Sequence, residues 1–356
     1  LGEIANAITL TDDMLLERVA YYLDSGADMI DVGMQANMEN PESAYHMVKI
    51  IKDNFDVPVS IDTINSREIK RALSAGADLV LSLDHGNYCK VIDDIKDYSA
   101  SAVLLPTDYS KNFIPQKALD RVKSLESLDK KCETINTIAD PLLDPINSHS
   151  LTNSIIACWL LRKRNPRKPL FFGVGNVSEL LDADSNGVNA VLSGIAMELG
   201  VSILFSPEAS LKTKGSIHEL KTASDMMFIA KKRNTIPKNV GVNLIRLKDQ
   251  YNRDDADIDL SDIPHIEAMA DGKFVPDYKG SFKIILADSK IHAVLYVDYK
   301  KTLVIESDSA RAIYEEIIRN DYISRIEHAA YLGMELEKAE IALKLGKNYV
   351  QDFPIF

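Results

Sequence analysis

Residues 26–32, Gly-Ala-Asp-Met-Ile-Asp-Val, contain the pattern that decides the fold. The apolar spacing before them predicts a helix over Asp12–Asp24, and glycine commonly ends a helix. Met29–Val32 then reads as a short buried strand. The same Gly-Ala-Asp recurs at Gly76–Asp78, again between a predicted helix and a predicted strand. Helices followed at once by buried strands are typical of parallel α/β folds.

About eight such strand–helix units are predicted before Thr235. The predicted strands are Leu1–Ala7, Met29–Val32, Val59–Ile61, Leu79–Ser82, Ala102–Leu105, Ile135–Ala139, Leu170–Gly173 and Ser202–Phe205. The predicted helices are Asp12–Asp24, Pro41–Lys52, Ser66–Ala75, Tyr88–Tyr98, Pro115–Leu128, Leu151–Arg164, Asn186–Leu199 and Ser216–Lys232. Eight units over this length predict a closed (β/α)8 TIM barrel in residues 1–235. An open doubly wound sheet is the alternative, but no Gly-x-Gly-x-x-Gly follows the first strand.

The pattern changes after about Thr235. Residues 236–275 are predicted to connect two domains, because Arg253–Asp257 and its surroundings are rich in charge. Residues 276–356 predict a small α+β domain. Its predicted strands are Phe282–Leu286, His292–Val297 and Leu303–Glu306, and its predicted helices are Ser309–Arg319 and Arg325–Leu345. This domain contains no motif for chemistry, so we expect it to cover a face of the barrel or to build an interface, for example in a homodimer.

Composition excludes several classes of partner. The net charge of -12 argues against nucleic acid and anionic membranes. The three cysteines, Cys89, Cys132 and Cys158, form no Cys-x-x-Cys pair, which fits the cytoplasm and offers no cysteine metal site. No apolar run is long enough to span a bilayer. The chain begins at Leu1 inside a predicted strand, so we expect it to be a piece of a longer protein.

Polar residues end several of the predicted strands, where barrel enzymes place their chemistry. They are Asn6, Asp31, Asp62, Ser82, Asp84, Asp140 and Asn176. Each alone is also typical of a helix cap or a turn, but several at one rim favour a binding site. A group of carboxylates and amides with few basic side chains suits a neutral ligand with paired N–H donors. The 2-amino-4-oxo edge of a pterin is such a ligand, and one carboxylate accepts both of its hydrogen bonds.

The start of the last predicted barrel helix has a different character. Lys212-Thr213-Lys214-Gly215-Ser216 places two lysines at the positive end of a helix dipole, where they are unfavourable. An anion bound between them would explain this placement, and barrels often bind phosphate near this helix. A solvated loop with two surface lysines is the alternative.

Three segments carry a resemblance to a known family. Met29–Gly33 and Val59–Thr63 resemble the second-strand and third-strand motifs of the pterin-binding superfamily, and Ile138–Leu142 resembles its sixth-strand Asp-Pro motif. The superfamily contains dihydropteroate synthases and methyltetrahydrofolate:corrinoid methyltransferases, all of them (β/α)8 barrels. The resemblance covers about residues 1–232. It looks closest to archaeal dihydropteroate synthase-related proteins, which carry an additional C-terminal domain and are thought to act in methanopterin synthesis.

The resemblance implies roles for particular residues. Asp62 and Asp140 would bind the pterin ring, and Asp31 would shape the same floor. Asn6 would match the asparagine that helps the synthases to hold diphosphate and Mg²⁺. Four further candidates stand where the synthases have different residues. Ser82 and Asp84 stand where the synthases have an Asn-Asp pair. Lys212 and Lys214 would replace the basic residues of the synthases that are missing here. The second substrate of a synthase is an arylamine.

Departures from the synthase pattern leave three functions open. Gly175-Asn176-Val177-Ser178 stands where the synthases have Ser-Arg-Lys, and it resembles the Ser-Asn-Val-Ser of the methyltransferases, whose asparagine contacts the reacting pterin nitrogen. Leu1-Gly2-Glu3 also resembles the first strand of the methyltransferases. The candidates are therefore a synthase that condenses a hydroxymethyl-dihydropterin diphosphate with an arylamine, a methyltransferase with a methyl-tetrahydropterin donor, and a non-catalytic pterin-binding protein. The two lysines favour the synthase.

Overall fold

The computed structural model describes residues 1–36, 38–245, 264–269 and 275–355. The chain divides into two compact units, Leu1–Gln250 and Tyr251–Phe356. Much of the predicted connection over residues 236–275, including its charged run, lies outside the described residues. No helix in the described part of the chain is long and apolar enough to cross a membrane.

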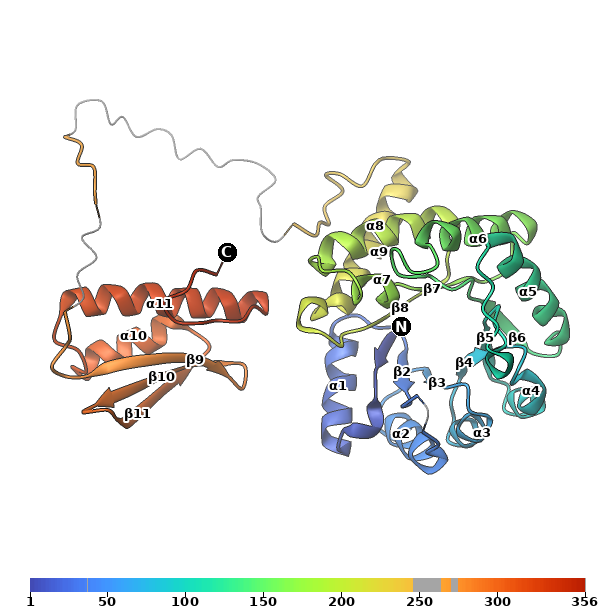
Figure 1. Cartoon of the computed structure of the whole chain (residues 1–356), viewed down its shortest axis with the longest axis horizontal. Coiled ribbons are helices and arrows are strands. Elements are labelled where there is room, and N and C mark those ends of the chain that lie inside the picture. Colours follow the sequence, from blue (N-terminus) through green and yellow to red (C-terminus); the bar gives the residue numbers. More distant parts are fainter. Residues whose placement is uncertain (37, 246–263, 270–274, 356) are drawn as a thin grey trace. The chain divides into compact units, whose positions relative to one another are not determined.

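The first unit is a parallel barrel, as the sequence predicts (Figure 1). Its strands are β1 (Gly2–Ile4), β2 (Ile30–Gly33), β3 (Val59–Asp62), β4 (Leu79–Leu83), β5 (Ser101–Leu104), β6 (Asn136–Ala139), β7 (Phe171–Gly173) and β8 (Ile203–Pro207). They are hydrogen-bonded in the order β6-β5-β4-β3-β2-β1-β8-β7. A parallel bridge between Ala139 and Leu170 joins the two ends of this order, so the sheet closes.

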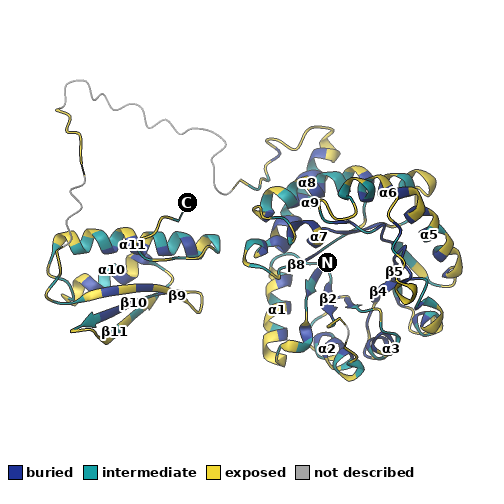
Figure 2. Ribbon diagram, viewed as in Figure 1, coloured by how far each residue is buried: buried dark blue, intermediate teal, exposed yellow. Residues whose placement is uncertain are grey.

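Helices surround the barrel on its outside (Figure 1). They are α1 (Asp12–Asp24), α2 (Pro41–Asn54), α3 (Ser66–Ser74), α4 (Ile92–Asp97), α5 (Ala118–Lys131), α6 (Leu151–Arg164), α8 (Ser185–Leu199) and α9 (Ser216–Arg233), with a short α7 (Gly175–Ser178) after β7. Gly26 and Gly76 follow α1 and α3 with φ of 95° and 104°, which explains the repeated Gly-Ala-Asp. The buried faces of the helices pack on the outer face of the barrel strands (Figure 2).

A second apolar core fills the inside of the barrel. It contains Leu81 of β4 and Phe171 of β7, two strands that are not neighbours, so this cluster crosses the interior. The rings of Phe171 and Phe205 lie 5.3 Å apart. This layer closes the barrel below the polar strand ends.

Among the predicted boundaries that differ from the structure, two have clear local reasons. The first strand ends at Ile4 rather than Ala7, because Asn6 adopts a left-handed conformation (φ 51°) and starts a 3-10 turn over Ala7–Thr9. The predicted helix Tyr88–Tyr98 is a 3-10 turn over Tyr88–Lys90 followed by α4. Val91 separates the two with a φ of -136°, which is not helical.

The second unit is a three-stranded antiparallel sheet with two helices, as predicted. Its elements are β9 (Ser281–Ala287), β10 (Lys290–Val297), β11 (Lys300–Ser307), α10 (Ala310–Arg319) and α11 (Ile326–Leu345). Two-residue turns join the strands, and Asp288-Ser289 and Asp298-Tyr299 all have positive φ, as tight hairpins require. A core of residues such as Ile284, Ile313 and Leu336 holds the helices to the sheet.

Candidate active site

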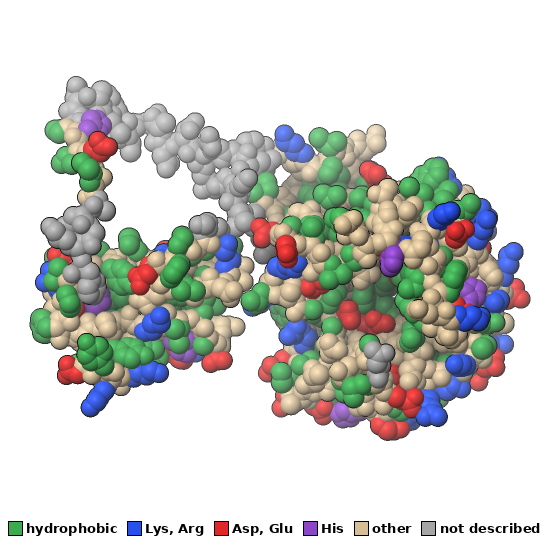
Figure 3. All heavy atoms as spheres, viewed as in Figure 1, with side chains coloured by type: hydrophobic (Ala, Val, Ile, Leu, Met, Phe, Trp, Pro, Cys, Tyr) green, Lys and Arg blue, Asp and Glu red, His purple; other side chains and the backbone are tan. Residues whose placement is uncertain are grey.

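Three carboxylates converge inside the barrel at β1, β2 and β3. The strand register places Glu3 opposite Asp31 and Asp31 opposite Ser60. Asp62 lies two residues beyond Ser60 and therefore on the same face of β3, one layer nearer the carboxyl ends. The carboxylate oxygens of Glu3, Asp31 and Asp62 all lie within 4.8 Å of one another. Figure 3 shows acidic side chains at the centre of the hollow on this unit.

Space for this cluster depends on Gly33, which lies opposite Asp62. A Cβ atom at position 33 would come within 2.8 Å of a carboxylate oxygen of Glu3 and 3.1 Å of the Ala5 backbone. A side chain here would displace the tip of Glu3 and crowd the Ala5 backbone, so glycine leaves room for the Glu3 carboxylate.

Burial changes the protonation of these acids. Burial, together with the charges of Asp62 and Glu179, raises the pKa of Glu3 to about 8. Burial raises the pKa of Asp62 to about 6. Burial and the charges of Asp62 and Glu3 raise the pKa of Asp31 well above its usual range. Water solvates these charges poorly here, so the cluster is stable only if protons or a cation neutralise part of its charge.

Asp140 follows β6 and is the acid best placed to meet a ligand. Its side chain is 8% exposed, and its Oδ1 accepts a hydrogen bond from the Leu142 N–H at 2.8 Å. Its Oδ2 has no hydrogen-bond partner among the described residues. Burial raises the pKa of Asp140 to about 7, and the Leu142 N–H opposes this rise. The charge of Asp62 also raises the pKa of Asp140, and both acids stand at the carboxyl ends of barrel strands.

Asn176 lies beside the same loop. Its Nδ2 donates to the Leu143 carbonyl at 3.1 Å, three residues after Asp140, and its side chain is exposed. Its Oδ1 is therefore free to accept a hydrogen bond from a ligand. Ser82, at the end of β4, is 8% exposed, and its hydroxyl has no hydrogen-bond partner in the described part of the chain.

Asp84 has a different role from the one that the resemblance implies. Its carboxylate accepts hydrogen bonds from the backbone N–H groups of Gly86 (2.7 Å), Asn87 (3.1 Å) and Tyr109 (2.6 Å), and from the Thr107 hydroxyl (3.3 Å). These bonds occupy both of its oxygens, so Asp84 organises the loops after β4 and β5 rather than meeting a ligand. Asp31 is likewise fully buried and lies below the rim.

Tyr109 and Glu3 are site residues that were not among the predicted candidates. Tyr109 is held by Asp84, and the charges of Asp84, Asp140 and Asp62 all act on its hydroxyl. Its ring is partly exposed, so Tyr109 is a candidate for a wall of the site beside the two acids. No motif marks Tyr109 in the sequence, whereas Glu3 stands in the Leu-Gly-Glu segment that resembles the methyltransferases.

Lys212 does not face an open anion site. It lies in a 3-10 turn (Leu211–Thr213), and its Nζ donates to the Leu181 carbonyl at 2.6 Å and to Asp182 at 3.2 Å. Lys214 is exposed. Lys212 thus ties the loop after β8 to the loop after α7, a contact that neither the anion site nor the solvated loop had predicted.

A carboxylate side chain of the protein already lies at the start of α9. Glu208 accepts a hydrogen bond from the Ile217 N–H at 3.0 Å, in the first turn of α9. Its other oxygen accepts from the Tyr21 hydroxyl at 3.0 Å. The carboxylate therefore fills the favourable position at the positive end of the helix dipole. No pattern in the sequence predicts this contact, because Glu208 lies nine residues from Ile217 and 187 residues from Tyr21.

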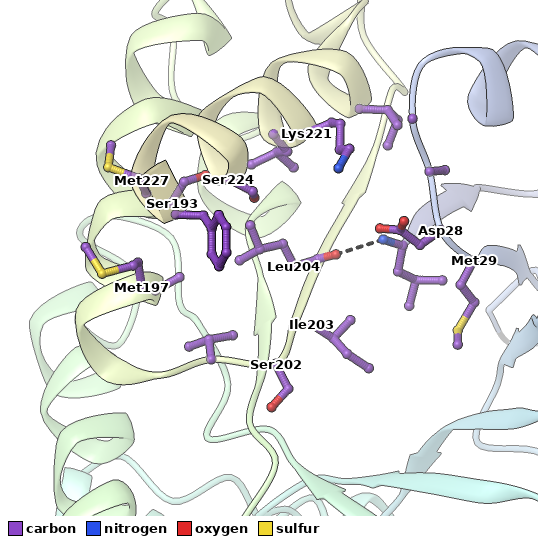
Figure 4. Close-up of a pocket in the computed structure, with 18 of the residues that line it drawn as sticks. Asp28, Met29, Ser193, Met197, Ser202, Ile203, Leu204, Lys221, Ser224 and Met227 are labelled. Atoms are coloured by element: carbon purple, nitrogen blue, oxygen red, sulfur yellow. Dashed lines mark hydrogen bonds between the residues drawn. The ribbon is translucent and has the colours of Figure 1, made fainter. Parts of the chain in front are cut away.

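A cavity of about 510 Å³ lies elsewhere, between α8, α9 and the amino ends of β2 and β8 (Figure 4). Its walls include Met29, Met197, Leu204 and Met227, with Lys221 on one side. This end of the strands is opposite to the acids. Because (β/α)8 enzymes act at the carboxyl ends of their strands, we assign the candidate active site to the acidic mouth.

Comparison with known proteins agrees with this fold. A family model described as pterin binding enzyme matches residues 4–203, and one described as PterinBD-DUF4346 matches residues 276–352. An uncharacterized protein of Methanocaldococcus jannaschii is 47% identical over 367 residues, which cover 100% of this chain and 69% of that protein. A dihydropteroate synthase of Streptococcus pyogenes serotype M3 is 23% identical over 245 residues, with 60% of this chain and 84% of the synthase covered.

Solved structures share the barrel. Dihydropteroate synthase of Yersinia pestis, solved with a pterine–sulfa conjugate, has a TM-score of 0.52 at 15% identity and covers 65% of this chain and 93% of its own. The Thermus thermophilus synthase has a TM-score of 0.50 at 18% identity and covers 63% of this chain and 90% of its own. Fold and site thus define a (β/α)8 barrel with an acidic mouth. The chain belongs to the pterin binding enzyme family, which confirms the resemblance.

Proposed function

We propose that this chain is a dihydropteroate synthase-like enzyme. It condenses a hydroxymethyl-dihydropterin diphosphate with an arylamine in the synthesis of a folate-like carrier such as tetrahydromethanopterin. The observation that carries the proposal is the free Oδ2 of Asp140 at a barrel mouth that it shares with Asp62. The dihydropteroate synthase relatives support the class of reaction.

The ring would bind with its 2-amino-4-oxo edge toward Asp140. An ionised carboxylate accepts two parallel N–H bonds, and burial strengthens them. Asp62, Ser82 and the free Oδ1 of Asn176 offer further acceptors around the ring. The Tyr109 side chain supplies an aromatic wall against which the ring can stack.

In the reaction, the arylamine nitrogen forms a bond to the exocyclic methylene carbon as the carbon–oxygen bond to diphosphate breaks. Diphosphate leaves with the electron pair of that bond, and the amine releases a proton. The fold family implies Mg²⁺ on the diphosphate, and the exposed side chain of Asn6, which has no hydrogen-bond partner in the described ranges, fits as its ligand. Mg²⁺ would neutralise charge on the leaving group. Lys214 would add positive charge near the diphosphate. Lys212 would do the same if its ammonium group left Asp182 and paired with the diphosphate instead.

Diphosphate release tests this function. The full chain is incubated with hydroxymethyl-dihydropterin diphosphate, Mg²⁺ and a panel of arylamines. We expect release that requires both the amine and Mg²⁺, and that falls in the Lys212→Ala/Lys214→Ala variant. The same variant should bind the pterin alcohol normally, since the alcohol lacks the anion. The absence of release with every amine tested would sink the synthase proposal.

Methyl transfer from a methyl-tetrahydropterin is the second candidate. Asn176 favours it, because the exposed amide stands in the segment that resembles the methyltransferases and has a free oxygen. The hydrogen bonds of Lys212 within the chain also remove part of the case for an anion site. The variants Asn176→Ala and Lys212→Ala/Lys214→Ala distinguish methyl transfer from the synthase reaction. Methyl transfer gains if Asn176→Ala abolishes turnover while the lysine variant keeps its affinity for the pterin diphosphate.

Ring binding should depend on pH through Asp140. Its folded pKa of about 7 means that the ionised form, which accepts both N–H bonds, becomes the main form as the pH rises through 7. Between pH 6 and pH 7.5 the ionised fraction grows about eightfold, so affinity for hydroxymethyl-dihydropterin should grow by about the same factor. Fluorescence titration at several pH values measures this. A flat profile in the wild type, or the same slope in Asp140→Asn, contradicts the assignment.

A further inference from the structure

The carboxylates of Glu3, Asp31 and Asp62 form a group that ring binding leaves largely unused. Glu3 and Asp31 are directly opposite in the register of β1 and β2, and Asp62 is one layer above on β3. Each offers an oxygen within 4.8 Å of the other two. No Lys, Arg or His in the part of the chain that the structure describes forms an ion pair with any of them.

A second observation points to a missing partner at this place. Asp31 is 0% exposed, and its Oδ2 is buried without a hydrogen-bond partner. Its Oδ1 is fixed at 2.5 Å by the Ser60 hydroxyl. A buried acceptor that makes no bond is costly, and one beside two further carboxylates is more so. The Ser60 bond holds the carboxylate in place, as outer hydrogen bonds commonly orient metal ligands.

We propose that Glu3, Asp31 and Asp62 bind one divalent cation that prefers oxygen ligands, such as Mg²⁺ or Mn²⁺. Opposite oxygens around Mg²⁺ are about 4 Å apart and those around Ca²⁺ about 5 Å, so oxygens within 4.8 Å reach a single ion with small side-chain movements. The ion supplies the partner that Asp31 Oδ2 lacks and neutralises the buried charge.

This site is separate from the Mg²⁺ that Asn6 would share with diphosphate. All of its ligands are protein carboxylates, so the cation binds without substrate. It also fixes one oxygen of Asp62 below the mouth and leaves the other for the ring. The deeper ion therefore shapes the ring site from beneath, whichever reaction the chain performs.

Titration of the metal-free chain with Mn²⁺ tests the proposal. The chain is treated with a chelator, and binding is followed at pH 8 by electron paramagnetic resonance of free Mn²⁺, without any pterin. We expect one saturable site per chain. Glu3→Gln and Asp31→Asn should each weaken it by at least about tenfold, because each removes one charged ligand. Asp120→Asn is the control, since it removes a carboxylate charge at the exposed start of α5, and it should leave Mn²⁺ affinity unchanged.

Absence of saturable Mn²⁺ binding in the wild type overturns the site. Binding that survives both Glu3→Gln and Asp31→Asn overturns it as well. If a variant fails to fold, as circular dichroism would show, anomalous scattering from Mn²⁺-soaked wild-type crystals decides instead. A peak between the three carboxylates supports the proposal, and a peak elsewhere or no peak refutes it. Because pterin is absent from these measurements, their failure leaves the proposed pterin reaction standing.

Discussion

Asp140→Asn should weaken the binding of hydroxymethyl-dihydropterin by about 100-fold, or about 2.7 kcal/mol. The ionised Oδ2 of Asp140 is expected to accept from the pterin edge, and an asparagine would place either a weaker acceptor or an N–H donor against the ligand's own donors. The variant keeps the oxygen that accepts from the Leu142 N–H, so the loop should stay in place. Isothermal titration calorimetry at pH 8 measures the loss.

Asp120→Asn is the matched control for this experiment. Asp120 is an exposed acid near the start of α5, and the same change of charge there should leave affinity unchanged. Thermal unfolding of both variants checks that the fold is intact. Equal affinity of wild type and Asp140→Asn would remove Asp140 from the ring site.

Arg121→Met should lower the free energy of unfolding by about 3–5 kcal/mol. The Arg121 side chain is fully buried and pairs with Asp144 at 2.5 Å. It also donates to the carbonyls of Pro115, Pro141 and Leu142, at 2.9, 3.2 and 2.9 Å. Methionine fills similar space but leaves a buried carboxylate and three carbonyls without these donors. Urea unfolding followed by circular dichroism measures the effect.

The loop after Asp140 gives this variant a second readout. Pro141 and Leu142 follow Asp140 directly, so loss of the Arg121 bonds should also weaken ring binding. Arg164→Met is the control, because Arg164 pairs with Glu126 at the surface, where such pairs contribute about 0–1 kcal/mol. A loss in Arg121→Met no larger than that in Arg164→Met would show that the buried arginine does not hold the loop.

The barrel could be predicted from sequence because its signals are local. Leu151–Arg164 was predicted with the bounds that the structure has, since Ser150 caps its start by accepting from the Asn153 N–H at 3.2 Å. The helix over Tyr88–Tyr98 was predicted wrongly at its start, which is a 3-10 turn. Asn87, just before it, donates to the Ser82 and Ile64 carbonyls, and such contacts with other loops have no pattern in a single segment.

The site was predictable only in part for the same reason. Strand ends could be read from the sequence, so Asp62, Asp140 and Asn176 were candidates, and the structure brings them to one mouth. The pairing of Glu3 with Asp31 depends on the register between β1 and β2, which the sequence does not display. The contact of Lys212 with Leu181 joins residues that are thirty-one positions apart, so nothing in the sequence indicates that Lys212 has a partner within the chain.

A crystal structure of the full chain with bound hydroxymethyl-dihydropterin tests the central claim most directly. The account predicts the ring in the barrel mouth, with its 2-amino-4-oxo edge on Asp140 and its face beside Tyr109. A ring bound in the cavity between α8 and α9 at the opposite end of the strands, or no ring at saturating concentration, would contradict it.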